Sequence, residues 1–305
     1  MENRLPLKQN IPVSGAPVDL AAGKKGGRPS FWAEIWKRMR RNTGSNIGLI
    51  VIAFLVVVSF GAPLIAPYDP YKVDFAHVRE APSWQHLMGT DMVGRDILTR
   101  MMYGGQASLA VGFISQVVIM FLGIIIGAIS GFYGGVIDTI IMRIIDIIFA
   151  FPTTLFLIIL MVLLGRGFFN LILAMTITSW VGPARLVRGQ VLQLKEREFI
   201  EAARSIGTRD RNIIFKHLLP NLLGPIIVSF TLGIPGAIMA EAGLSFLGMG
   251  LLPPTPSWGI MLSLGYDYFR VSPYMVIFPA ITIAIVMISF LYIGDGLRDA
   301  FGTTR

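Results

Sequence analysis

The sequence predicts an all-α membrane protein with six transmembrane helices. Of its 305 residues, 54% are hydrophobic and only 14% are charged, whereas soluble domains carry about 25% charged residues. The apolar residues gather in stretches of roughly 20, the length that crosses a bilayer as a helix. Lys and Arg concentrate in the segments that would share one side of the membrane, as the positive-inside rule requires. These three observations define the fold class.

Two segments precede the first span. Residues 1–30 are rich in Pro, Gly and Lys and lack an apolar period, so we expect a disordered cytoplasmic tail. Residues 31–46 place Phe31, Ile35 and Met39 four residues apart, with basic residues close behind. This pattern predicts an amphipathic helix lying in the membrane interface. A charged flank without fixed structure is the alternative.

The transmembrane domain covers residues 47–300. With about 20 apolar residues for each crossing, the spans fall at 47–66, 105–130, 140–164, 168–187, 222–249 and 274–296. The connecting segments 67–104 and 251–273 are then the long external loops.

The distribution of positive charge orients the chain. If both termini are cytoplasmic, 20 of the 26 Lys and Arg residues lie in cytoplasmic segments and six in external ones. This asymmetry predicts cytoplasmic N- and C-termini. The net charge of +8 is therefore interpreted as a consequence of membrane topology, and no nucleic acid partner is expected.

Small residues and prolines mark the spans internally. Gly123, Gly127 and Gly131 recur every fourth residue of the second span, a spacing that lets another helix approach closely. Pro152 and Pro183 lie inside predicted spans, where proline removes a helix hydrogen bond and kinks the helix.

A polar, basic segment, residues 194–220, interrupts the hydrophobic second half. Gly207 suits the end of a first short helix, and Thr208 suits the N-cap of a second. The expected apolar faces are Phe199, Ala203 and Ile206 on the first helix and Ile213, Ile214, Phe215 and Leu218 on the second. Periodicity alone leaves two interpretations open: a surface offered to a soluble partner, or an amphipathic loop on lipid headgroups.

Several motifs carry a resemblance to a known family. The central segment contains Glu201-Ala202-Ala203, Gly207, Ile214 and Leu219-Pro220, which resembles the coupling motif of permease subunits of bacterial ABC importers. The segment after the first span reads His86-Leu-Met-Gly89-Thr90-Asp91-Met-Val-Gly94-Arg95-Asp96. It is similar to the corresponding loop of the dipeptide, oligopeptide and nickel importer permeases, as are 184–190, 241–248 and 294–300. The resemblance covers about residues 31–300 and is closest to the second of the two permeases of such importers.

The resemblance implies a type I ABC importer permease fold, also called MetI-like, in a bacterial inner or plasma membrane. The implied partners are a homologous second permease, two ABC ATPase subunits and an extracytoplasmic solute-binding protein. The implied substrates are dipeptides or oligopeptides, with nickel chelates, glutathione and oligosaccharides as alternatives. The implied ATPase-coupling residues are Glu201, Ala202, Ala203, Gly207, Ile214, Leu219 and Pro220.

The chain is not expected to be an enzyme or to hold a cofactor. It contains no G-x-x-x-x-G-K-S/T phosphate-binding loop, so ATP and Mg²⁺ are expected on the partner ATPases. It has no Cys, and its three His residues are not spaced as metal ligands. A secondary transporter would favour internal repeats, and an intramembrane enzyme would need clustered reactive groups; neither pattern is found.

Three acidic features leave alternatives open. Glu241 lies deep in the fifth span, so it either lines the substrate path or forms structural hydrogen bonds within the bundle. Asp91 and Asp96 suggest a cation site, but they lack EF-hand spacing, and turn formation with an N-cap by Asp96 is simpler. Arg143 and Asp146 are three residues apart, which predicts a local ion pair.

Overall fold

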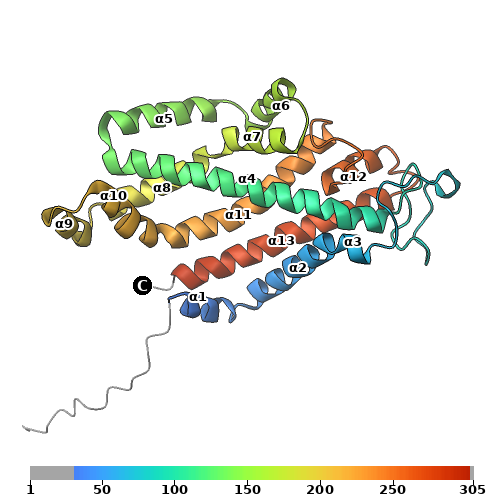
Figure 1. Cartoon of the computed structure of the whole chain (residues 1–305), viewed down its shortest axis with the longest axis horizontal. Helices are drawn as coiled ribbons and strands as arrows, with labels where there is room; N and C mark the ends of the chain where they lie inside the picture. The colour runs from blue at the N-terminus through green and yellow to red at the C-terminus, as the bar shows by residue number, and fades with distance from the viewer. Residues whose placement is uncertain (1–30, 303–305) are drawn as a thin grey trace, which may run out of the picture.

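The computed structural model describes residues 31–302, so the tail predicted for residues 1–30 lies outside the described part. Four long helices form its frame (Figure 1). Each is long and apolar enough to cross a membrane. They are α2 (Thr43–Phe60), α4 (Ile97–Tyr133), α11 (Leu219–Phe246) and α13 (Tyr274–Gly302). Helix α2 packs along α13, and α11 packs against both α13 and α4.

The third predicted span is not one straight helix, which corrects the expectation for 140–164. Helix α5 (Gly135–Ala150) and helix α6 (Thr153–Leu164) meet at an angle of 90°. Pro152 at the break has no N–H for the helix ladder. The preceding residue, Phe151, is extended, with φ −91° and ψ 135°, as residues before proline prefer.

The fourth predicted span is also divided. Helix α7 (Phe168–Ser179) has only 12 residues, and α8 (Val181–Leu194) follows after Trp180. Within residues 31–302 the structure therefore has four helices that could each cross a membrane, or five if the bent α5–α6 pair counts as one. The all-helical membrane architecture is confirmed, whereas six continuous spans are not observed.

Helices α4 and α8 approach each other through glycine. A Cβ atom on Gly127 would lie 2.4 Å from the carbonyl oxygen of Ala184, and one on Gly123 would lie 2.5 Å from Pro183. Gly131 likewise faces Val191. The close helix contact predicted from the glycine spacing is confirmed, and its partner is the segment that leads into residues 194–220.

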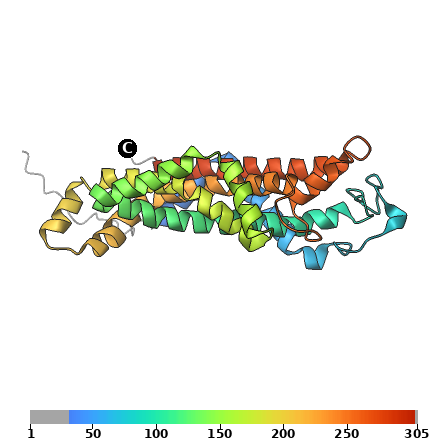
Figure 2. The same cartoon turned by 90° about the horizontal axis from the view of Figure 1, so that it is seen from above.

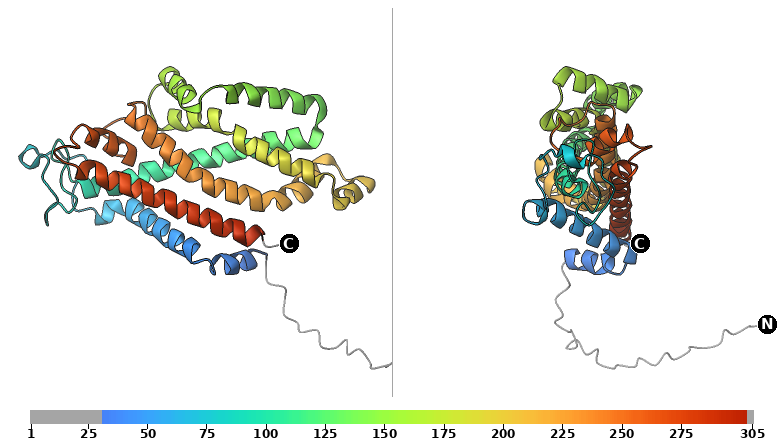
Figure 3. Two further views of the ribbon diagram at one scale, coloured as in Figure 1. Left: turned by 180° about the vertical axis from the view of Figure 1, so that it is seen from behind. Right: turned by 90° about the vertical axis from the view of Figure 1, so that its right-hand side faces the viewer.

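The two ends of the molecule differ in character. One end holds α1 (Phe31–Met39), the C-terminal end of α13 and the short helix α9 (Glu198–Ser205). The other end holds α3 (Ala62–Ile65), the short helical turn Phe75–His77, the loops around it and α12 (Trp258–Tyr266) (Figures 1 and 2). Figure 3 shows α1 and α2 along one edge and α5 and α6 along the opposite edge.

Helix α1 is shorter than the predicted segment 31–46. It ends at Met39, and Asn42 begins α2 by accepting a hydrogen bond from the Ser45 N–H at 3.1 Å. Ile35 and Met39 are buried, and α1 packs on α13. An amphipathic helix is thus attached to the end of the last long helix.

Candidate functional site

The central polar segment projects from one end of the bundle (Figure 1). After α8, the chain forms α9, a bend, the single turn α10 (Asp210–Asn212) and a π-helical stretch, Ile213–Leu218, that runs into α11. The expected arrangement of two short helices joined by a bend is therefore present. The second helix is continuous with α11.

Gly207 makes the bend possible. Its φ of +75° lies in the left-handed region that favours glycine. The Thr208 N–H donates to the Ala203 carbonyl at 3.0 Å, and the Gly207 N–H donates to Arg204 at 2.9 Å. This is the Schellman arrangement that ends a helix. Thr208 is not the next N-cap, contrary to expectation: Arg209 holds that position without a side-chain cap.

The faces of the two short helices differ from those expected. Ile200 and Ala203 are buried, whereas Phe199 is 42% exposed and Ile206 is 82% exposed. In the following stretch, Phe215 is 61% exposed. The residue that anchors α9 is thus Ile200, which the spacing did not single out, and part of each apolar face stays exposed.

The anchor of α9 is a cluster shared with three long helices. Ile200 packs with Phe132 of α4, Val191 of α8 and Leu222 of α11 in one buried apolar group. The guanidinium of Arg204 also lies 5.5 Å from the ring centre of Phe132. One face of α9 is therefore fixed to packed helices of the bundle.

The seven residues expected at the ATPase contact fall into two groups. Glu201, Ala202, Gly207 and Pro220 are exposed. The other three contribute to the packing under α9 and its continuation. Of these, Ala203 and Ile214 are buried and Leu219 is half-buried.

Glu241 lies in a closed polar pocket and is 0% exposed. Its Oε1 accepts hydrogen bonds at 2.8 Å from Ser245 and Ser257, and its Oε2 accepts one at 3.3 Å from Ser108. Ser108 also accepts from the Trp258 N–H at 3.1 Å. The carboxyl group thus joins α11 to α4 and to the start of α12. This geometry favours the structural alternative over a path-lining role.

Sequence reasoning missed the partners of Glu241. Ser257 and Ser108 are 16 and 133 residues away from it in the chain, so no local pattern joins them. Ser245 is four residues further along the same helix, and this helical spacing was the one available signal.

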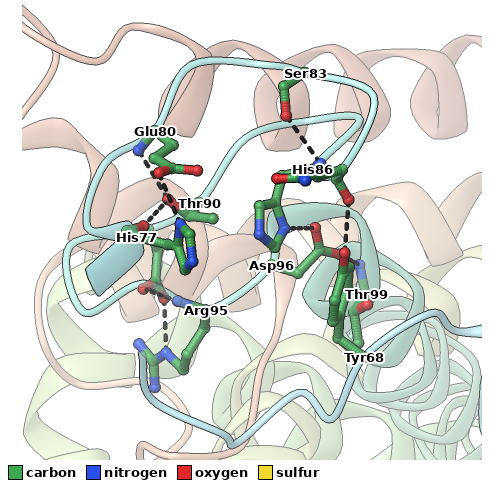
Figure 4. A network of polar contacts seen from close by, with 11 residues as sticks. Tyr68, His77, Glu80, Ser83, His86, Thr90, Arg95, Asp96 and Thr99 are labelled. Atoms are coloured by element: carbon green, nitrogen blue, oxygen red, sulfur yellow. Dashed lines mark hydrogen bonds and ion pairs between the residues drawn. The ribbon is translucent and has the colours of Figure 1, made fainter. Parts of the chain in front are cut away.

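Many side-chain hydrogen bonds and ion pairs hold the loop from Tyr68 to Asp96 (Figure 4). Asp91 Oδ1 accepts from the N–H groups of Val93 and Arg95, and its Oδ2 accepts from Arg95 Nε at 2.7 Å. Asp96 Oδ2 accepts from the Thr99 N–H at 2.8 Å. The predicted N-cap of α4 by Asp96 is confirmed, and the two carboxylates are engaged in shaping the loop.

Glycine and histidine complete this loop. A Cβ on Gly94 would lie 1.7 Å from the Asp74 carbonyl oxygen. Thr90 Oγ1 accepts from the Glu80 N–H at 2.8 Å. His86 Nδ1 is 2.9 Å from Asp96 Oδ1, and its ring contacts Tyr68 with 4.8 Å between centres. Among the described residues, no group of three His, Asp or Glu side chains is placed to hold a metal ion.

Helix α5 is tied to α8 by two ion pairs. Arg188 Nε lies 2.5 Å from Asp138 Oδ1, and Arg185 Nη2 lies 2.6 Å from Asp146 Oδ1. Ser130 of α4 also donates to Asp138. Asp146 therefore pairs with a neighbouring helix and not with Arg143, because the packing of α5 on α8 brings Arg185 to its side.

The fold and these sites define an all-helical membrane protein with a polar segment that projects from one end of the helix bundle. Comparison with protein families matches residues 123–303 to "binding-protein-dependent transport system inner membrane component". Residues 30–82 match the N-terminal transmembrane domain of oligopeptide transport permease C.

Individual proteins agree with this match. The chain is 43% identical to the oligopeptide transport system permease protein OppC of Bacillus subtilis, over 89% of each chain. It is 42% identical to the glutathione transport system permease protein GsiD of an Escherichia coli strain, over 88% of this chain and 89% of that one. Among solved structures, the inward-facing MetNI methionine ABC transporter shares the fold, with a TM-score of 0.54 at 21% identity over 66% of this chain and 95% of that one.

The chain belongs to the family of binding-protein-dependent transport system inner membrane components. It is a multi-pass permease subunit of a bacterial ABC importer, located in the inner membrane. It is a transport component, and ATP binds to the partner ATPase subunits of such importers. Importers of this family also work with a binding protein, as the family description states.

Proposed function

We propose that this chain forms, together with a homologous second permease, the membrane pathway for peptides delivered by an extracytoplasmic binding protein. The 43% identity to an oligopeptide permease over nearly the whole length supports peptides as the substrate class. Glutathione, itself a small peptide, is the second candidate, because a glutathione permease is nearly as similar, at 42%.

The projecting α9 is the proposed contact with an ATPase subunit, and this observation carries the mechanism. Glu201 and Ala202 are exposed beside the 82% exposed side chain of Ile206. A hydrophobic side chain at the tip of a polar projection fits a groove on a soluble partner. Ile200 fixes the other face of α9 to the cluster that α4, α8 and α11 share.

This arrangement links the ATPase cycle to the pathway. When the two ATPases close on ATP, the one docked to this chain carries α9 with it. Because α9 is packed against three long helices, these helices move with it as a body and change the side of the membrane to which the pathway opens. Interface and core packing transmit such shifts because they are not continuously deformable.

The proposed topology has six crossings and cytoplasmic termini. The bent α5–α6 pair and the divided α7–α8 pair would be the third and fourth crossings. The end that carries α1, the C-terminal end of α13 and α9 would then face the cytoplasm (Figure 1). The opposite end, with the loop 67–96 and α12, would face the binding protein.

The proposed coupling is tested by changing the tip without disturbing its anchor. Replacing Ile206 by Asp places a charge where an apolar groove is expected, so the ATPase subunits should no longer co-purify with the permease, and uptake should fall at least tenfold. The matched control is Val271→Asp, at a residue 74% exposed at the opposite end. Co-purification that is equally strong for both variants would contradict docking at α9.

A further inference from the structure

A small cavity between four helices is bordered by a side-chain amide, that of Gln116. The cavity has a volume of about 270 Å³ and lies between α4, α7, α8 and α11. Gln116 of α4 lines it and is only 5% exposed. Within residues 31–302, the Gln116 amide has no hydrogen-bond partner. Its amide atoms are not enclosed by protein, so they can be reached from the cavity and can offer a donor and an acceptor to a molecule that enters it.

The neighbours of Gln116 leave room for a ligand. Gly233 of α11 lies against the amide, since a Cβ there would be 2.3 Å from Gln116 Cδ. One turn further, Gly236 is exposed, and a Cβ there would meet nothing within 4 Å. The glycines thus keep the α11 side of the cavity open, while Gln116 forms its polar wall.

The lining of the cavity is polar but uncharged. Besides Gln116, the hydroxyl groups of Ser179 and Ser229 border it, and the described lining residues include no Asp, Glu, Lys or Arg. A primary amide offers both a hydrogen-bond donor and an acceptor. A peptide bond can pair with both, because its C=O accepts a hydrogen bond and its N–H donates one. A neutral wall also neither attracts nor repels the charged side chains of a passing peptide.

We propose that Gln116 is the residue that binds the backbone amide of the substrate where the substrate path meets the cavity beside α4 and α11. This inference rests on the proposed function, because it requires a peptide in the path. Gln116 would recognise the backbone that all peptides share. The uncharged lining would allow side chains of either charge to pass. Glu241 does not share this role, because its carboxylate oxygens already accept hydrogen bonds from three serines.

The experiment uses the complete importer in proteoliposomes, with both permeases, the ATPases and the binding protein. Uptake is measured for three tripeptides, Ala-Ala-Ala, Ala-Lys-Ala and Ala-Glu-Ala. Gln116→Met keeps the size but loses the hydrogen bonds, so uptake of all three should fall about tenfold, the order expected for a lost hydrogen bond. Gln116→Glu adds a negative charge, so uptake of Ala-Glu-Ala should fall about tenfold more than that of Ala-Lys-Ala.

Control variants and stability measurements decide between the outcomes. Gln190→Met removes another half-buried amide, on α8 and outside the cavity lining, and should leave all three rates unchanged. Unchanged uptake by both Gln116 variants overturns the inference. The inference is also overturned if uptake falls equally for all three peptides with both variants and the melting temperature falls as well, because Gln116 would then serve only to pack against Gly233. Absence of peptide uptake by the wild-type complex would instead refute the proposed function itself.

Discussion

At the scale of single residues, the carboxyl groups of Glu241 and Glu201 have the same chemistry but lie in different environments. Glu241 is enclosed and bonded to three hydroxyl groups from α4, α11 and the start of α12. Glu201 is exposed on α9, where a soluble partner can reach it. Burial decides the difference, because an enclosed carboxyl group needs internal partners, whereas an exposed one is available for docking.

Replacing Glu241 by Leu should destabilise the protein. The hydroxyl groups of Ser245 and Ser257 would be left without their acceptor, at a cost of about 1–3 kcal/mol for each buried group. We expect a lower melting temperature in detergent, whereas Ser263→Ala, at a half-buried position whose hydroxyl group makes one long hydrogen bond of 3.4 Å to the Phe246 carbonyl, should change it little. If Glu241→Gln melted like the wild type but altered the pH profile of uptake, Glu241 would belong to the substrate path after all.

The loop of residues 67–96 should respond to pH through His77. The hydrogen bond to Glu80 Oε1, at 2.8 Å, raises the pKa of His77 above its ordinary value of 6.5, and the negative charge of Glu80 raises it further. Because the folded pKa is the higher one, the contact stabilises the loop below about pH 6.5 and loses this effect as pH rises through the raised pKa.

Hydrogen exchange of residues 67–96 measures this effect. Glu80→Gln should speed exchange strongly at about pH 5.5 and weakly at about pH 8.5, on either side of the His titration. Glu34→Gln, in an ion pair with Arg38 at the other end of the molecule, serves as the control and should leave this loop unchanged. An equal effect of Glu80→Gln at both pH values would be incompatible with titration of His77.

At the scale of elements, the contact between α4 and α8 organises the coupling region. Gly127 lets α4 lie against the backbone of α8, and two Arg–Asp pairs add α5 to the same group. Helix α8 continues to Leu194, directly before α9. The position of α9 thus depends on how closely α4 and α8 pack.

Gly127→Ala should weaken this packing. Its Cβ would lie 2.4 Å from the Ala184 carbonyl oxygen and 2.9 Å from Val187 Cβ, and overpacking of this kind costs about 1–3 kcal/mol. Thermal unfolding in detergent should show the loss. Gly189→Ala on α8 is the matched control, because its Cβ would meet nothing within 4 Å. Identical melting of the two variants would show that α4 and α8 are not in such close contact.

At the scale of the whole molecule, the two ends face different partners in the proposed topology. The chain contains no Cys, so single cysteines can report their side of the membrane. Ala33 lies exposed on α1, and Ala81 lies exposed in the loop at the other end. In right-side-out vesicles, a membrane-impermeant thiol reagent should label Ala81→Cys and not Ala33→Cys. The reverse pattern would invert the topology, and labelling of both would require an even number of crossings between them.

The sequence by itself determined the class of the protein and the outline of its fold. Long apolar runs specify membrane helices because burying unbonded backbone in lipid is costly. Local chemistry likewise predicted the helix end at Gly207 and the cap by Asp96, since each depends on residues within a few positions. The motif in 194–220 indicated the family that the comparisons then showed.

Only the tertiary structure decided which side chains meet across the chain. The partner of Asp146 and the outward face of Ile206 both depend on how helices rotate and pack. Ser108 and Ser257 reach Glu241 from distant segments, and the cavity beside Gln116 is lined by residues of other helices. Periodicity gives the faces of one helix, but it does not give the rotation of that helix against its neighbours, and in a bundle this rotation determines which groups are bonded and which stay available.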